Sequence, residues 1–233
     1  MATTEIAVHG AEHEVQPQPV VNNFSIQVAT VNGSGSQSAN TVLLRTIFQM
    51  GVPVSGKNMF PSNIAGLPTW YTIRASKKGY IARKKEIDFL VAMNAETAKE
   101  DVLSLAPCAV ALYDEPLKLN ELRSDLAFYA VPYDKITAAV CPESKLRKLV
   151  KNMVYVGVVA KLLNLDMAEV EKALRKQFAK KVKAADLNWN AAKAGYDYAA
   201  ASLTKADSFI IERMDKTTGM INESALEIGR AHV

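Results

Sequence analysis

A loop of small residues, Gly33-Ser-Gly-Ser-Gln-Ser38, carries the residue types that bind phosphate. Glycines let a backbone turn tightly and approach a ligand closely, and Ser34, Ser36 and Ser38 add hydroxyl groups. A helix that begins directly after such a loop presents free N–H groups and the positive end of its dipole to an anion. We predict that Ser38 is the N-cap of that helix. The same pattern also fits a plain tight turn between a strand and a helix.

The stretch after the loop contains a lysine where dinucleotide sites usually have an acid. Such sites place a carboxylate about 20 positions after the glycines, where it binds the ribose hydroxyls. The corresponding stretch, Val52–Ser62, contains Lys57 and no carboxylate. This composition counts against NAD, and a lysine beside Gly56 better fits a ligand with an additional phosphate. Lys57 equally fits a solvated surface charge.

Strands that alternate with helices predict an α/β fold with a Rossmann-like, largely parallel sheet, an antiparallel hairpin and a helical C-terminal portion. The predicted strands span Asn23–Val31, Val52–Val54, Thr69–Ser76, Ile87–Met93, Ala109–Tyr113 and Leu126–Val131. Lys77-Lys-Gly79 predicts a hairpin turn, after which Tyr80–Glu86 returns as an antiparallel strand. The predicted helices span Ala39–Met50, Ala95–Leu105, Leu146–Gly157, Asp166–Phe178 and Asp186–Leu203.

Composition describes an ordinary globular protein, with 49% hydrophobic and 22% charged residues. No apolar run approaches the ~20 residues that a membrane span needs, and the polar start has no apolar signal segment, so we expect a cytoplasmic protein without a membrane. Residues 144–183 contain eleven Lys or Arg against three acidic residues. This basic region fits a solvated helix face, an anionic ligand or an acidic partner. Aromatic residues are not interleaved with it, so nucleic acid is not expected.

Four motifs in this order resemble the gamma subunit or gamma domain of 2-oxoacid:ferredoxin oxidoreductases. They are Gly33–Ser38, Gly56-Lys-Asn-Met-Phe-Pro-Ser-Asn63, Gly66-Leu-Pro-Thr-Trp-Tyr71 and Lys151-Asn-Met-Val-Tyr-Val-Gly157. The second and third resemble the 2-oxoglutarate branch in particular, and the whole resemblance covers Asn23–Leu203. Loops of this family often run Gly-x-Gly-Gly-Gln-Gly, whereas Ser36 and Ser38 stand here, which makes this loop less permissive.

The C-terminal segment Ile221–Gly229 resembles the opening of the alpha domain, which follows the gamma domain in fused members of the family. Residues 1–21 are polar, contain two prolines and show no periodicity, which predicts a flexible tail. The resemblance implies a gamma domain over 22–204. A linker and the truncated start of an alpha (thiamine-enzyme) domain would occupy 205–233. A free-standing gamma subunit is the other interpretation.

The resemblance implies the reversible conversion of 2-oxoglutarate, CoA and oxidised ferredoxin to succinyl-CoA, CO2 and reduced ferredoxin. The sequence lacks a Gly-Asp-Gly…Asn-Asn thiamine motif and has only two cysteines, too few for a cluster. Thiamine diphosphate, Mg²⁺ and [4Fe-4S] clusters are therefore expected on the partner alpha and beta portions, with ferredoxin bound through a partner subunit. No residue here is a candidate general base, nucleophile or metal ligand. This domain is expected to hold CoA and to help close the active site.

The resemblance and the charge pattern together assign a set of residues to CoA. They are Gly33, Ser34, Gly35, Ser36, Ser38, Lys57, Asn58, Phe60, Lys151 and Asn152. The loop would contact phosphate through main-chain and hydroxyl groups, with Lys57 as a point charge and Lys151 on the basic helix. Asn58 and Asn152 would hydrogen-bond the adenine or pantetheine arm, and Phe60 would offer an apolar surface. Two alternatives are a structural docking module without a ligand and an independent NADP-type reductase domain.

Overall fold

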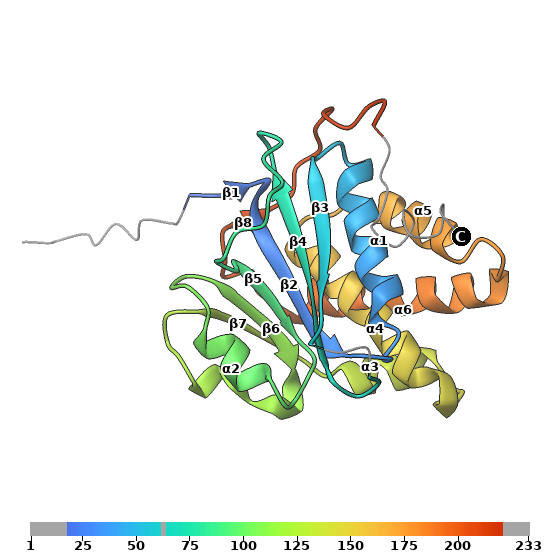
Figure 1. Cartoon of the computed structure of the whole chain (residues 1–233). Coiled ribbons are helices and arrows are strands. Elements are labelled where there is room, and N and C mark those ends of the chain that lie inside the picture. Colours follow the sequence, from blue (N-terminus) through green and yellow to red (C-terminus); the bar gives the residue numbers. More distant parts are fainter. Residues whose placement is uncertain (1–17, 62–63, 221–233) are drawn as a thin grey trace, which may run out of the picture.

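The computed structural model describes residues 18–61 and 64–220, and within them a six-stranded sheet runs through the middle of the molecule (Figure 1). Its strand order is β3-β4-β2-β5-β6-β7. The strands are β2 (Asn23–Val31), β3 (Val54–Met59), β4 (Pro68–Ser76), β5 (Phe89–Ala92), β6 (Val110–Asp114) and β7 (Ala127–Val131). Strands β2, β5, β6 and β7 are parallel neighbours, and β4 is antiparallel to both β2 and β3. The predicted α/β class with a largely parallel sheet is confirmed.

The antiparallel part of the sheet does not use the segment that the sequence predicted. The turn after β4 forms, with Gly79 N donating to Ser76 O at 2.9 Å, but Tyr80–Glu86 does not return as a strand. Both edges of β4 are already paired, one with β2 and the other with β3. The exposed segment 80–86 therefore has no strand edge of β4 left to join.

Strand β3 begins where the prediction ended. The expected strand at Val52–Val54 is instead β3 at Val54–Met59, and so Lys57 and Asn58 lie on an edge strand rather than in a loop. Gly56 in this strand permits the pairing, because a Cβ there would overlap the hydroxyl of Tyr71 on β4. The run Ser-Gly-Lys-Asn has low strand propensity, which explains why the pattern did not predict it.

Helices cover the two faces of the sheet unequally (Figure 1). The helices are α1 (Ser36–Gln49), α2 (Ala98–Leu103), α3 (Tyr133–Val140), α4 (Ser144–Leu162), α5 (Met167–Gln177) and α6 (Val182–Ser202). Two short 3-10 turns, Glu115–Leu117 and Leu119–Glu121, follow β6. Side chains of β2 such as Ile26 and Val28 pack in the larger core with α1, α4, α5 and α6, whereas Ala29 packs on the α2 side. Helix α3 was missed by the sequence patterns.

A small second sheet joins two segments that lie far apart in the sequence. Strand β1 (Val20–Val21) pairs in parallel with β8 (Phe209–Ile210), and the rings of Phe24 and Phe209 lie 5.3 Å apart. Asn22 adds a donor to Glu212 O at 2.8 Å and an acceptor for Glu212 N at 3.0 Å. The pairing of β1 with β8 joins the range that was predicted as a tail, 1–21, to the range that was predicted as a linker, which begins at 205. The predicted alpha-domain start at 221–229 lies outside the described residues.

Helices α4 and α6 pack with their backbones in direct contact. A Cβ on Gly157 would overlap the carbonyl oxygen of Ala192, and a Cβ on Gly195 would overlap that of Val154. The two helices can approach this closely because Gly157 and Gly195 have no side chain. A close-packed protein interior tolerates little added volume.

We expect Gly157→Ala to lower the free energy of unfolding by about 1–3 kcal/mol through overpacking. On an open helix the same change would raise stability by about 1 kcal/mol, so the sign of the effect reports the contact. Equilibrium urea unfolding followed by circular dichroism measures it. Lys193→Gly at an exposed position in the middle of α6 is the control, with a loss of just under ~1 kcal/mol from helix propensity alone. An unchanged or higher stability for Gly157→Ala would contradict the packing.

Candidate functional site

Helix α1 begins at Ser36, three residues before the predicted start at Ala39. Gly35 is the N-cap, with φ 83°, and the helix starts at Ser36, so the prediction of Ser38 as N-cap was wrong. Gly33 has the same φ of 83°, a left-handed conformation that favours glycine. Within the described residues no side chain caps this helix start. The N–H groups of the first turn are consequently left to solvent or to a ligand.

Helix α4 holds this helix start from behind. Asn152 Nδ2 donates to Ser34 O at 2.8 Å, and one turn later Tyr155 donates its hydroxyl proton to Asn40 Oδ1 at 2.9 Å. The Tyr155 hydroxyl also lies 3.4 Å from Ser36 O. Burial raises the pKa of the Tyr155 phenol, so the hydroxyl remains a donor throughout the neutral range. Asn152 is thus a support of the loop in this structure.

The other side of the loop is held by the chain that precedes β4. Asn32 N donates to Leu67 O at 2.8 Å, and Gly66 N donates to Asn32 O at 3.0 Å. Asn32 Nδ2 adds a bond to Ile64 O at 3.1 Å. The hydroxyl of Ser36 points inward to Thr30, with the two oxygens 2.8 Å apart. Ser36 can therefore offer a ligand its N–H group rather than its side chain.

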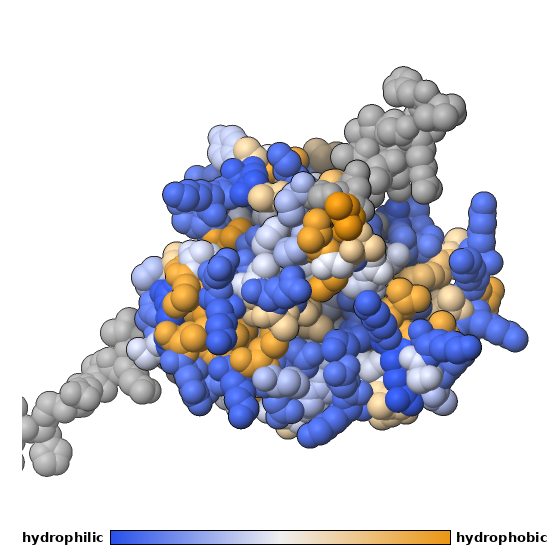
Figure 2. Space-filling view, turned by 60° about the horizontal axis from the view of Figure 1, so that its bottom comes forward, coloured by the Kyte–Doolittle hydropathy of each residue, from blue (hydrophilic) through white to orange (hydrophobic). Residues whose placement is uncertain are grey.

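Five of the predicted residues line one hollow at the start of α1, which we call the loop depression. Its volume is about 490 Å³, and Gly33, Gly35, Ser36, Asn58 and Phe60 lie in its wall. The wall is completed by Asn32, Gln37, Thr69 and Leu149. The edge strand and the helix meet here, since Asn58 Nδ2 donates to Gln37 Oε1 at 3.3 Å. Figure 2 brings this end of the molecule forward and shows hydrophobic patches set among hydrophilic side chains.

Lys57 lies in a neighbouring hollow, the edge depression. Successive side chains of a strand point to opposite faces, so Lys57 and Asn58 leave β3 on different sides. The edge depression has a volume of about 480 Å³, is lined by Lys57, Trp70 and Arg83, and shares Asn58 and Phe60 with the loop depression. Arg83 was missed because its segment was predicted as a plain return strand.

Four predicted residues line neither depression, and one of them is Asn152, which supports the loop. Ser38 Oγ accepts a bond from Gln177 Nε2 at 3.5 Å, on the side of α5. Lys151 Nζ is ion-paired with Asp114 at 2.9 Å and Asp134 at 3.0 Å. Burial opposes the charge on Lys151, but the bonds to these two carboxylates outweigh it and raise the pKa of the ammonium group. Ser34 is different again, because its buried Oγ has no hydrogen-bond partner among the described residues.

The comparison with known proteins identifies the family of the chain. The family model described as pyruvate ferredoxin/flavodoxin oxidoreductase matches residues 25–198, which include β2, the loop, α1 and α4. The chain belongs to this family. The predicted resemblance to 2-oxoacid:ferredoxin oxidoreductases is therefore confirmed.

Two of the similar proteins are much longer than this chain. It is 21% identical over 154 residues to the alpha subunit of 2-oxoacid:ferredoxin oxidoreductase 2 from Aeropyrum pernix, covering 65% of this chain and 24% of the relative. A solved 2-oxoglutarate:ferredoxin oxidoreductase from Magnetococcus marinus, with 2-oxoglutarate, coenzyme A and succinyl-CoA bound, matches with a TM-score of 0.75 and 25% identity. That match covers 84% of this chain and 34% of the Magnetococcus chain. The chain thus spans about a quarter to a third of the length of these relatives.

Two smaller proteins share the fold over nearly their whole length. The gamma subunit of a keto/oxoacid ferredoxin oxidoreductase from Geobacter sulfurreducens matches with a TM-score of 0.62 and 18% identity, over 77% of this chain and 99% of that one. The pyruvate oxidoreductase subunit PORC from Thermotoga maritima matches with a TM-score of 0.61 and 17% identity, over 76% and 96%. The predicted gamma-type fold is confirmed by these likenesses.

We expect Asn152→Ala to loosen the loop, because Ser34 O then loses its 2.8 Å partner on α4. The lost hydrogen bond contributes about 1.4 kcal/mol to the stability of the closed loop. Without it, amide hydrogen exchange over residues 33–38 should be roughly tenfold faster. Exchange followed by mass spectrometry measures this. Lys148→Ala, at an exposed position one turn earlier on α4, is the control and should leave the exchange unchanged. Equal exchange in both variants would show that Asn152 does not hold the loop.

Proposed function

We propose that this chain is the gamma domain of a 2-oxoglutarate:ferredoxin oxidoreductase and that the loop depression holds the phosphates of coenzyme A. The observation that carries the proposal is the uncapped start of α1 at Gly35, which opens into a hollow lined by Asn58 and Phe60. Helix starts of this kind bind anions through their N–H groups and dipole. The bound coenzyme A of the structurally similar Magnetococcus enzyme supports the choice of ligand.

The loop fits a pyrophosphate group closely in its chemistry. Gly33 and Gly35 place no side chain between the ligand and the backbone. A Cβ on Gly35 would come within 2.6 Å of Leu149 Cδ2, on the rim of the same hollow. In this proposal Asn152 and Lys151 act on the ligand only through the loop and α4 that they support.

The edge depression fits a further phosphate. Lys57 and Arg83 supply two positive charges, and none of the described residues lining either depression is Asp or Glu. Asn58 and Phe60 line both hollows, so one elongated ligand can extend from the loop to the lysine. Coenzyme A has this shape and charge pattern, with a pyrophosphate, a ribose phosphate and an apolar pantetheine arm.

The role of the chain in the reaction is therefore to bind and orient a substrate. Thiamine diphosphate with Mg²⁺ on the alpha and beta portions would supply the decarboxylation, and their [4Fe-4S] clusters would pass electrons to ferredoxin. The loop and the edge strand fix the phosphate end of CoA, which leaves the thiol end free to reach the partner. Holding a reactant in place in this way lowers the entropic part of the barrier.

We expect Lys57→Ala to weaken coenzyme A binding about tenfold, because a charge-assisted contact to the ribose phosphate is worth about 1.4 kcal/mol. Dephospho-CoA lacks that phosphate, so its affinity should be the same for the wild type and the variant. Isothermal titration calorimetry measures both ligands. Lys77→Ala removes an exposed lysine from the turn after β4 and should change neither affinity. If both ligands bound the wild type equally well, the phosphate assignment of Lys57 would be lost.

Gly35→Ala tests the loop itself. Strain at positive φ of about 1–2 kcal/mol and contact with Leu149 should deform the helix start, and coenzyme A affinity should fall about tenfold or more. Gly79→Ala is the matched control, since Gly79 also has φ +83° but has nothing within 4 Å of an added Cβ. It should lose similar stability and keep its affinity.

Two further measurements separate this proposal from its two alternatives. If the KM for coenzyme A of the assembled oxidoreductase were the same for the wild type and Gly35→Ala, a docking module without a ligand would be favoured. Binding of NADPH by the isolated chain, measured by absorbance titration, would favour a reductase domain.

A further inference from the structure

An apolar groove lies between α4 and α6, beside the loop depression. We call it the α4–α6 groove. Its volume is about 550 Å³, and its floor is formed by Leu146, Val150, Met153, Phe178 and Leu187. Leu149 at its rim is 50% exposed, and Val182, which does not line the groove but stands between the lining residues Lys181 and Lys183, is 68% exposed. Large apolar side chains left open around an apolar hollow are typical of an interaction site.

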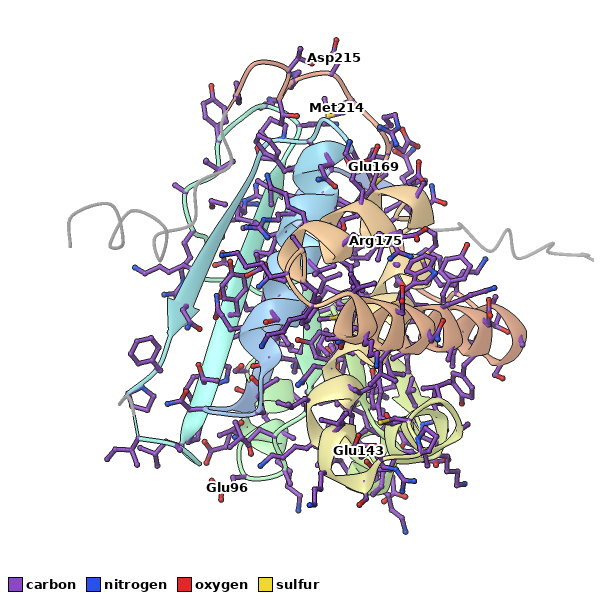
Figure 3. All side chains as sticks on the ribbon, turned by 90° about the vertical axis from the view of Figure 1, so that its right-hand side faces the viewer. Glu96, Glu143, Glu169, Arg175, Met214 and Asp215 are labelled. Carbon is purple, nitrogen blue, oxygen red and sulfur yellow. The ribbon has the colours of Figure 1, made fainter. Side chains whose placement is uncertain are left out.

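The border of the groove is positively charged. Lys181 and Lys183 line it at the start of α6, and Glu143 is the one carboxylate among the described lining residues. The nearby carboxylate of Asp186 is already bonded to Arg175, at 3.1 Å (Figure 3, where Arg175 lies on α5 and Glu143 at the start of α4). The groove therefore presents an apolar floor, and the two ammonium groups at one end form no ion pair with the residues that the structure describes.

The groove is continuous with the proposed coenzyme A site. Gly35 and Leu149 line both the groove and the loop depression. A polypeptide seated in the groove would consequently lie directly beside the loop that is proposed to hold the phosphates of coenzyme A.

We propose that the α4–α6 groove docks a segment of the thiamine-diphosphate-carrying portion of the oxidoreductase, a segment whose apolar side chains are flanked by Asp or Glu. This inference rests on the proposed function for the identity of the partner. The apolar floor takes the partner's apolar side chains, and Lys181 and Lys183 pair with its carboxylates. Interfaces of this type combine a buried apolar centre with a charged rim, and the rim charges raise the rate of association.

The chemistry of the groove separates this partner from a membrane surface. Anionic lipid also attracts apolar and lysine side chains, but an interfacial helix presents one continuous apolar face, whereas these side chains line a hollow between two helices. Anionic phosphatidylserine vesicles nevertheless serve as a second probe in the experiment below.

The test uses this full chain with the purified alpha and beta portions of the same enzyme, and it measures their dissociation constant by biolayer interferometry. Ala184→Glu places a carboxylate in the wall of the groove and, in the first turn of α6, interacts favourably with the helix dipole, so the fold is retained. Lys181→Glu with Lys183→Glu reverses the rim charge. We expect both variants to bind the partner at least tenfold more weakly, and the double variant to show a smaller dependence on salt.

Matched controls carry the same changes on other surfaces. Leu103→Glu alters a side chain that is 59% exposed on α2, across the sheet, and Lys77→Glu with Lys78→Glu reverses two exposed lysines after β4. We expect both controls to bind like the wild type. Equal binding by the groove variants and the wild type would overturn the proposal, as would vesicle binding that depends on the groove while partner binding does not.

Coenzyme A titrations of the same variants separate the two proposals. Groove-dependent assembly with no coenzyme A binding by the wild type would remove the ligand and keep the docking surface. Coenzyme A binding with groove-independent assembly would remove the docking surface alone.

Discussion

The hydrogen bonds from α4 to the start of α1 are the constraint on which the site depends. A helix start at positive φ, without a capping side chain, exposes polar backbone groups that ordinarily favour fraying. Here Asn152 and Tyr155, three residues apart on α4, reach Ser34 and Asn40 on either side of that start. Because α4 is itself fixed against α6 through Gly157, the position of the loop is coupled to the packing of this helix pair. The apolar packing of the C-terminal helices thereby becomes the scaffold for the proposed anion site.

The sheet topology explains why the polar residues gather at this end. Strand β2 is parallel to β5 on one side and antiparallel to β4 on the other, so the carboxyl end of β2 lies where the direction of the sheet changes. Ligands of open α/β sheets bind in crevices beyond the carboxyl ends of the parallel strands. The antiparallel addition of β3 brings Asn58 and Phe60 to the same end, and this extends the hollow beyond what a parallel sheet alone provides.

Sequence patterns predicted the parallel strands and the long helices well, because burial and periodicity decide them locally. They misplaced the edge of the sheet, where Gly56, Lys57 and Asn58 form a strand through pairing with β4 rather than through their own propensity. The cap of α1 was also misjudged, since Ser38 fits the cap preference but Gly35 alone fits the backbone angle. Arg83 and the carboxylate partners of Lys151 depend on tertiary contacts across the chain. No local pattern contains them.

The pairing of β1 with β8 has an evolutionary consequence. It brings the backbone that enters the fold, at Val20–Val21, next to the backbone that leaves it, at Phe209–Ile210. A unit with adjacent entry and exit points can be joined to another polypeptide, or separated from it, with little strain on either. The related folds show both arrangements, one as a third of a long chain and another as almost an entire subunit. Gene fusion and fission in this family would then require no redesign of the unit itself.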